Sequence, residues 1–342
     1  MDLVFTIIMP TLNSEKTIEK SLKSIRNQEF EQKKIEILLC DGGSTDKTLE
    51  IGLDFGCKII RNENKLPEWG KYFGFIEAKG KYIVFMDSDE EFTNKNSLKN
   101  RFECFINNKN IKNIICSGLL NPPSFSEINF YSNTVGDPFS FFIYGIEGDN
   151  FQKSLKRKYS ILLEEENYYL ISFNKNSLYP IIDGGTHTFE KEFILNLISD
   201  SFSINTIPLI FNLMARKTMA LGVMKNDFIN HYSSSNIKTY VSKIKWRIEH
   251  SIFFPDKSGV GFINREKFLP HFVKIKKIFF IPYSFSIIIP AITGIRLFLE
   301  KKKKVFLLHP FITFFTSFYI LFCVIAKIFG KKIKTSTSYG NK

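Results

Sequence analysis

The stretch YIVFMDSDEEF, residues Tyr82 to Phe92, runs from five apolar residues directly into two aspartates. A short apolar run of this kind predicts a buried β-strand, with Asp87 and Asp89 just past its carboxyl end. Residues two apart in an extended chain point to the same side, so the two carboxylates are expected to lie together. Such a pair suits a hard divalent cation with oxygen ligands, Mg²⁺ or Mn²⁺. The competing interpretation is a solvated acidic loop after a strand.

Apolar runs and helical patterns alternate through the first hundred residues. We expect strands at 4–9, 34–41, 57–62 and 81–87, with helices inside 13–28, 42–56 and 70–80. This alternation predicts an α/β fold whose mostly parallel sheet is covered by helices on both faces. Ligands bind such sheets at the carboxyl ends of the strands. Further strands are expected at 113–120 and 168–173, and residues 121–150 are expected to form a long aromatic loop.

Three motifs follow one another in this region, each at a strand end. They are IIMPTLNSEKTIEKSLKSI, ILLCDGGSTDKTLEI and EAKGKYIVFMDSDEEF. Together they resemble the nucleotide-sugar-binding half of the family 2 glycosyltransferases, which have the inverting GT-A fold. The resemblance is close over residues 4 to 105 and fades beyond them.

The resemblance implies roles for individual residues. The nucleotide-sugar site would comprise Pro10, Thr11, Asn13 and Glu15 at the nucleoside, Asp41 at the base, Lys71 near the diphosphate, and Asp87 with Ser88. The metal, Mn²⁺ or Mg²⁺, would be held by Asp87, Asp89 and His231. A structural histidine and an exposed structural lysine are the competing interpretations of His231 and Lys71.

The general base is harder to assign. The family usually supplies it from an acidic pair about ninety to a hundred residues beyond the DxD, and this sequence has no clean pair there. Asp183, which follows an apolar run and precedes two glycines, is the predicted base. Glu190 and Asp200 are its rivals, and an ordinary turn aspartate is the alternative.

The last third of the chain changes character. Residues 236–277 alternate apolar and basic residues and predict a basic amphipathic region at a membrane interface. Two apolar runs within 278–330 each have a length close to the ~20 residues that a helix needs to cross a bilayer. Pro282 and Pro290 could kink the first run into a re-entrant or interfacial segment, and two buried core helices are the alternative. Residues 331–342 form a basic tail.

Composition supports a membrane-bound protein with a reduced interior. The net charge is +13, with the basic residues beside apolar runs, which favours an anionic membrane over nucleic acid. The five cysteines are scattered through apolar strings and are expected to be reduced core residues, as in a cytoplasmic catalytic part.

These observations predict a GT-A domain over 1–235, with a nucleotide-sugar half at 1–105 and an acceptor half at 106–235, followed by membrane-embedded helices. The expected activity is metal-dependent, inverting transfer of a hexosyl-type sugar from a UDP or GDP donor. The expected acceptor is a polyprenyl-linked or cell-surface glycan at the cytoplasmic membrane face. The alternatives are a nucleotidyl- or phosphotransferase, which should carry a glycine loop rich in Arg and Lys, and an inactive nucleotide-binding or scaffold subunit.

Overall fold

The computed structural model describes residues 2–180, 185–198, 202–253 and 268–330. By its internal contacts the chain divides into two compact units. The first comprises 1–120, 150–175 and 181–232, and the second comprises 121–149, 176–180 and 233–342. This division places residues 121–149 with the C-terminal helices, whereas the sequence-based boundaries placed them in the N-terminal domain.

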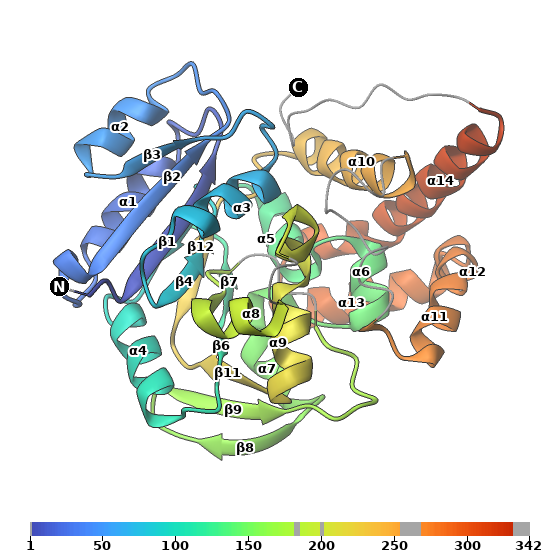
Figure 1. The fold of residues 1–342 in the computed structure, drawn as a ribbon. Helices are drawn as coiled ribbons and strands as arrows, with labels where there is room; N and C mark the ends of the chain where they lie inside the picture. Colours follow the sequence, from blue (N-terminus) through green and yellow to red (C-terminus); the bar gives the residue numbers. More distant parts are fainter. Residues whose placement is uncertain (1, 181–184, 199–201, 254–267, 331–342) are drawn as a thin grey trace. The chain divides into compact units, whose positions relative to one another are not determined.

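The first unit is built on a nine-stranded mixed sheet in the order β3-β2-β1-β4-β10-β6-β11-β9-β8 (Figure 1). β1 pairs in parallel with β2 and β4, and β10 runs antiparallel between β4 and β6. The strands are β1 (Phe5–Thr11), β2 (Ile35–Asp41), β3 (Lys58–Arg61), β4 (Tyr82–Phe85), β6 (Asn113–Ile115), β8 (Ser160–Glu164), β9 (Tyr168–Ser172), β10 (Thr188–Glu190) and β11 (Ala220–Met224).

Helices cover this sheet in the way expected of an α/β fold. They are α1 (Ile18–Arg26), α2 (Thr48–Asp54), α3 (Pro67–Glu77), α4 (Ser97–Asn107), α7 (Phe151–Lys156), α8 (Lys191–Ile198) and α9 (Ile210–Thr218). One core cluster joins Ile8 and Phe85 of the sheet region to Phe75 of α3 and Met214 of α9. Every residue of β1 is buried, as expected of a strand covered by helices on both faces of its sheet. The four strands and three helices predicted for the first hundred residues are confirmed.

A second, three-stranded sheet lies beside the aspartates. Its order is β5-β12-β7, formed by β5 (Glu90–Phe92), β12 (Phe228–His231) and β7 (Gly118–Leu120). The expected single strand at 113–120 is therefore two strands, since β6 belongs to the large sheet and β7 to the small one. This small sheet brings residues 228–231 against the chain that follows the DxD.

The loop expected over 121–150 is wrong. Within the second unit this segment forms α5 (Glu127–Val135) and α6 (Pro138–Tyr144). Asp137 caps α6 by accepting from the amide of Ser140, and Pro138 occupies the first turn, where its missing N–H costs nothing. Aromatic residues made the segment look irregular, but their spacing lets Tyr131 and Phe141 join an apolar core.

The remaining helices of the second unit lie in the C-terminal third. They are α10 (Ile237–Phe253), α11 (His271–Ile278), α12 (Phe280–Phe285), α13 (Ile288–Lys301) and α14 (His309–Ile328). α10 lies within 236–277, the segment that the sequence predicts to be a basic amphipathic region at a membrane interface. Tyr240, Ile244 and Ile248 are buried against residues of α5 and α14, so the apolar face of α10 is used inside the unit.

Residues Lys304–Ile328 form one helical stretch long and apolar enough to cross a membrane, by length and composition alone. The preceding run is bent by 87° between Phe285 and Ile288. Pro282 and Pro290 each lie in the first turn of a helix, α12 and α13 respectively, as expected of prolines that begin helices. All five cysteines are buried core residues, as predicted.

Candidate active site

The loops after β1 and β2 are joined by hydrogen bonds between side chains of one loop and backbone amides of the other. Asn13 adopts a positive φ of 50°, and its side-chain Oδ1 accepts from the amide of Thr45 at 2.8 Å. Glu15 accepts from the amide of Lys47 at 3.2 Å, and its own amide donates to Asp46 at 3.2 Å. The two sequence motifs therefore form one continuous surface at the carboxyl edge of the sheet.

Asp41 ends β2 and holds the glycine turn that follows it. Its carboxylate accepts from the amides of Gly43 at 2.8 Å and Ser44 at 3.0 Å, and from the Ser44 hydroxyl at 2.5 Å. A carboxylate has about four acceptor positions, so little capacity is left for a further donor. The structure thus gives Asp41 a turn-forming role beside the base contact that the resemblance implies.

Two buried oxygens at this edge have no hydrogen-bond partner within the described residues. They are Oγ1 of Thr11, at the end of β1, and Oδ1 of Asn62, just after β3. Buried polar atoms are normally paired with protein or water. They lie at the carboxyl ends of β1 and β3, the two neighbours of β2, where a ligand of an α/β sheet would meet them.

Lys71 reaches the DxD from α3, which packs unusually close to β1. A Cβ at Gly74 would lie 2.4 Å from Cγ2 of Ile8, so only glycine allows this approach. The buried ammonium of Lys71 lies 3.2 Å from Oδ1 of Asp87. Burial alone would lower the pKa of Lys71, but the carboxylates of Asp87, Glu68 and Glu90 outweigh it and raise the pKa. Lys71 is therefore a fixed positive charge beside the first aspartate.

The serine of the DSD motif connects the aspartates to the first loop. Its hydroxyl donates to Oγ of Ser14 at 2.9 Å, and its carbonyl accepts from the hydroxyl of Ser21 at 3.0 Å. Ser88 thus fixes the turn between Asp87 and Asp89 against the β1 loop and α1.

His231 lies next to Asp89 although 142 positions separate them in the sequence. β12 pairs with β5 so that His231 stands opposite Glu90, and Nε2 of His231 is 3.8 Å from Oδ1 of Asp89. Both side chains are partly exposed. The structure therefore places two of the three residues that the sequence proposed as metal ligands beside each other, while the carboxylate of the third, Asp87, pairs with Lys71.

The donor set suits a metal that shares its coordination with a substrate. Within the described residues no group of three or more His, Cys, Asp or Glu is arranged to hold a metal ion by itself. Mg²⁺ in particular is commonly bound by one or two carboxylates together with substrate phosphates. Asp89, with His231 beside it and Asp87 across the turn, fits such an incomplete site.

Glu90 is a site residue that sequence reasoning passed over. It is buried, and its carboxylate accepts from the amide of Asp87 at 3.0 Å and from the amide of Gly185 at 2.6 Å. Burial raises the pKa of Glu90, and the neighbouring Asp87 raises it further. The alternation in EEF, which turns Glu90 and Phe92 inward together, is the signal that could have identified it.

Of the three candidates for the base, only Glu190 lies in the described part of the chain. It stands opposite Tyr82 at the amino-terminal end of β4, whereas Asp87 follows the other end of that strand. Its carboxylate is paired with Lys112 and lies 3.9 Å from Lys81. Glu190 is therefore a structural ion-pair partner remote from the DxD. Asp183 and Asp200 lie outside the described residues.

A comparison with known protein families agrees with the placement of these motifs at the sheet edge. Residues 6–111 match the family model described as Glycosyl transferase family 2. Over this segment the chain is similar to the family 2 glycosyltransferases. The segment contains every motif at the carboxyl edge of the sheet except the strand that carries His231.

Curated relatives match part of this chain. The poly(ribitol-phosphate) β-N-acetylglucosaminyltransferase TarS of Staphylococcus aureus is 34% identical over 101 residues, 28% of this chain and 18% of TarS. A GalNAc(5)-diNAcBac-PP-undecaprenol β-1,3-glucosyltransferase of Campylobacter jejuni is 34% identical over 93 residues, 25% of this chain and 29% of that enzyme. The chain thus spans less than a third of the length of either relative.

A solved structure extends the likeness to the whole fold. The mannosyltransferase PcManGT from Pyrobaculum calidifontis, in complex with GDP-Man and Mn²⁺, has a TM-score of 0.51 and 13% identity, covering 97% of this chain and 89% of that one. The fold is GT-A, as predicted.

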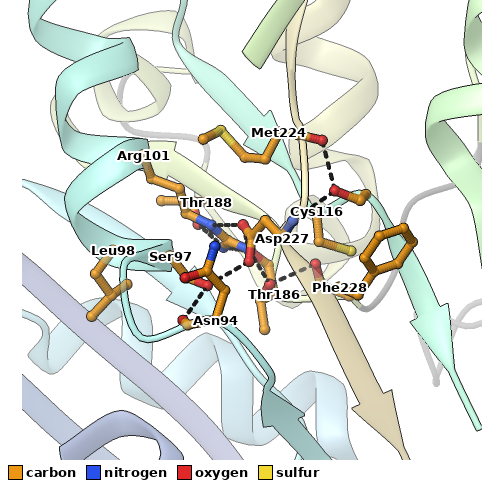
Figure 2. Close-up of polar contacts among 12 residues, drawn as sticks. Asn94, Ser97, Leu98, Arg101, Cys116, Thr186, Thr188, Met224, Asp227 and Phe228 are labelled. Carbon is orange, nitrogen blue, oxygen red and sulfur yellow. Dashed lines mark hydrogen bonds and ion pairs between the residues drawn. The ribbon is translucent and has the colours of Figure 1, made fainter. Parts of the chain in front are cut away.

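A buried ion pair joins α4 to the residue that precedes β12 (Figure 2). Arg101 of α4 lies 2.8 Å from Asp227, and both side chains are fully buried. The same guanidinium donates to the Thr186 carbonyl, to the Thr186 hydroxyl at 2.5 Å and to the Thr188 hydroxyl at 2.7 Å. It therefore joins α4 to the segment after Gly185 and to the start of β12, which ends at His231.

Sequence reasoning missed this pair. The one local feature that could have indicated this ion pair is the position of Arg101 between Leu98 and Phe105, at helical spacing on the buried face of α4. A charged residue at a core position of an amphipathic helix is unusual and indicates a buried partner.

Proposed function

We propose that the chain is an inverting glycosyltransferase that transfers a hexosyl-type sugar from a UDP- or GDP-sugar to a polyprenyl-linked or cell-surface glycan acceptor, at the cytoplasmic face of a membrane. The observation that carries this proposal is the meeting of four elements at one sheet edge. The loops after β1 and β2, Lys71 of α3, the DSD turn and His231 all lie there. The family 2 match of residues 6–111 supports it independently.

The donor's diphosphate would meet a set of fixed charges. Bound Mn²⁺ or Mg²⁺, held by Asp89 with Asp87 and His231, would act as a Lewis acid on the leaving diphosphate. Lys71 would keep its positive charge throughout, since the surrounding carboxylates raise its pKa. Pro10, Thr11, Asn13, Glu15 and Asp41 would form the wall that receives the nucleoside.

Inversion follows from a single displacement at the anomeric carbon. The acceptor oxygen forms its bond to that carbon while the bond to the diphosphate oxygen breaks, and the hydroxyl proton passes to a carboxylate base. Asp183 remains the proposed base. It is two positions before Gly185 in the sequence, and the amide of Gly185 donates to Glu90 of the DxD segment.

The proposed acceptor is supported by the name of one relative and by the charge and exposed apolar residues of this chain. The name of the Campylobacter jejuni relative describes a glycan on undecaprenyl diphosphate as its substrate. Here the chain carries a net charge of +13 and exposes many large apolar side chains on α11 to α14. An acceptor held at an anionic membrane suits that surface.

Calorimetric titration of the full chain with UDP and with GDP, with and without Mn²⁺, tests the donor site. We expect metal-dependent binding of one nucleotide, weakened about 100-fold or more in Asp89→Ala, since a metal–phosphate contact contributes several kcal/mol. Asp54→Ala, a change at an exposed residue of α2, is the matched control and should bind as the unmodified chain does. Binding of neither nucleotide under any metal condition would reject the proposal.

Turnover separates an enzyme from an inactive subunit. With the nucleotide identified, release of UDP or GDP from the matching nucleotide-sugar should be lost in Asp183→Asn, while nucleotide binding persists. Binding without release of nucleotide from any donor, with every acceptor tried, would identify a nucleotide-binding scaffold instead.

A further inference from the structure

The helices of the second unit expose an unusual amount of apolar surface. On α14, Phe311, Phe314, Phe318, Phe322 and Ile325 are all exposed, at spacings of three or four residues. This spacing places them along one face of the helix. Contiguous exposed apolar surface on this scale marks an interaction site.

α13 continues this surface. Ile288, Ile292, Ile295 and Leu299 are exposed, again at helical spacing. α11 contributes Phe272 and Ile278, of which the latter is 72% exposed. The exposed apolar side chains thus extend over three helices of one unit.

The opposite side of α14 packs against charged protein. α10 runs alongside α14 (Figure 1), and their apolar residues share one core cluster. The ammonium of Lys245 lies 5.3 Å from the ring centre of Tyr319, at the middle of α14, and the Tyr319 hydroxyl donates to Glu249. Arg247, which lies between Lys245 and Glu249 on α10, is 3.9 Å from Asp137, the residue that caps α6.

These charges bear on how α14 can meet a bilayer. If α14 spanned the membrane, the α10 residues packed against its middle would lie in the hydrocarbon core. Charged side chains are costly there, and polar backbone must be satisfied internally. α14 can bury its exposed face in lipid at no such cost if it lies along the surface.

α13 is tied to the same protein body. Arg296 lies 3.1 Å from Glu147, and Lys301 lies 2.6 Å from Asp149 and 3.1 Å from Glu147. Lys303 lies 4.4 Å from the ring centre of Phe130 in α5. Lys301 and Lys303, between α13 and α14, are therefore held against residues 147–149 and α5, within the second unit.

The charge of these helices fits one kind of partner. Residues 268–330 contain eight lysines and Arg296 but only one acid, Glu300. Among the lysines, Lys274, Lys302, Lys304 and Lys327 are exposed next to the apolar face. Apolar helices bordered by lysines suit the headgroup region of a membrane containing anionic lipid.

We propose that the exposed face of α11, α13 and α14 docks in one leaflet of an anionic bilayer, with no helix among the described residues crossing it. This replaces the spanning helix that hydropathy alone suggests for Lys304–Ile328. The proposal does not depend on sugar transfer, so its failure leaves the donor-site test untouched.

Flotation of the purified full chain with lipid vesicles tests the docking face. With phosphatidylcholine vesicles containing one quarter phosphatidylglycerol, we expect most of the chain to float. Ile292→Glu combined with Phe318→Glu should reduce the floating fraction at least 10-fold. Leu162→Glu on β8, at 59% exposure close to the 62% and 56% of the two target residues, is the matched control and should float normally. Circular dichroism checks that each variant is folded.

Two outcomes of flotation would overturn the docking face. The double variant could float as well as the unmodified chain. Alternatively, the unmodified chain could fail to float and form oligomers in light scattering, which would mean that a second copy covers the apolar face.

Thiol labelling distinguishes docking in one leaflet from spanning. Lys304→Cys and Lys332→Cys flank α14, the latter outside the described residues, and the native cysteines are buried and give the background. In sealed, oriented membrane vesicles from expressing cells, both introduced thiols should react with an impermeant maleimide from the same side. Reaction from opposite sides would establish a crossing and reject docking in one leaflet.

Discussion

The first unit contains two buried cations among acidic groups, Arg101 and Lys71, and their surroundings differ. Arg101 has a partner for each of its five N–H donors: Asp227 twice, the Thr186 carbonyl, and the hydroxyls of Thr186 and Thr188. Asp227 in turn accepts from the hydroxyl of Ser97 at 2.6 Å. A cluster so fully satisfied has no capacity left for a ligand.

Lys71 is surrounded by more negative charge than it can neutralise. Three carboxylates, those of Asp87, Glu68 and Glu90, act on its one positive charge. Asp87 is partly exposed, and the nearby Asp89 faces His231 at 3.8 Å, too far for a hydrogen bond. Excess negative charge at an accessible strand end attracts cations, whereas the closed Arg101 cluster fixes the fold. The comparison teaches that an excess of carboxylates at a partly exposed strand end marks a binding site, whereas a closed, fully buried ion pair marks a structural one.

The largest expected effect is on the closed cluster. Arg101→Met should lower the free energy of unfolding by about 3–5 kcal/mol, because it leaves the Asp227 carboxylate buried without its charge partner. Denaturant unfolding monitored by circular dichroism measures this. Lys99→Met, an exposed change in the same helix, is the control and should stay within about 0.5 kcal/mol.

A double variant shows whether the loss comes from the unpaired charge. Arg101→Met with Asp227→Leu leaves no charge behind, and replacing both members of a buried pair is often close to neutral. We expect it to recover part of the lost stability. A single Arg101→Met variant as stable as Lys99→Met would show that the cluster is not structural.

The second expected effect falls on binding. Lys71→Met should weaken binding of the nucleoside diphosphate by roughly 10- to 100-fold, since a hydrogen bond to a charged group contributes about 1.5–3 kcal/mol. Its effect on unfolding should be smaller than that of Arg101→Met, because Asp87 is partly exposed and can be hydrated. Titration calorimetry with UDP and GDP measures the affinity.

Lys23→Met, at an exposed position of α1, is the matched control for Lys71. If Lys71→Met were to destabilise the fold as strongly as Arg101→Met and leave nucleotide binding intact, the distinction between the two clusters would not hold.

The same contrast explains what could be predicted from the sequence. The strands, the loops after them and the DxD come from short-range patterns, such as apolar runs that end in Asp41 or Asp87. These elements agree with the structure. The support for the site joins residues far apart in the chain: Arg101 and Asp227 are 126 positions apart, and Glu90 and Gly185 are 95 apart. No local pattern encodes such pairs.

The second unit shows a different limit. Hydropathy identifies α14 as apolar but cannot tell which of its faces meets protein. α10 and α14 share a core only because residues more than sixty positions apart pack together, as Tyr319 does with Glu249. The aromatic run over 121–150 was mistaken for a loop for the same reason, since its side chains find their partners in distant helices.

The smallest expected effect concerns a buried histidine of the second unit. His250 of α10 stacks on Trp246 at 3.6 Å between ring centres, with Nδ1 3.0 Å from the Trp246 carbonyl. Burial lowers the pKa of His250, against the opposing influences of that carbonyl and of Glu249. The folded state therefore holds the imidazole neutral at pH values where the unfolded chain, with an ordinary histidine pKa of about 6.5, already binds a proton. The neutral His250 imidazole therefore stabilises the fold above about pH 6.5, and this stabilisation is lost as the pH falls towards the lower pKa of the folded state.

Thermal unfolding at stepped pH between 7.5 and 5.5 should show a falling Tm for the unmodified chain and a flatter profile for His250→Phe, which keeps the stacking. The exposed His271→Gln change should leave the profile unaltered. An equal slope for His250→Phe and the unmodified chain would mean that groups other than His250 dominate the pH dependence.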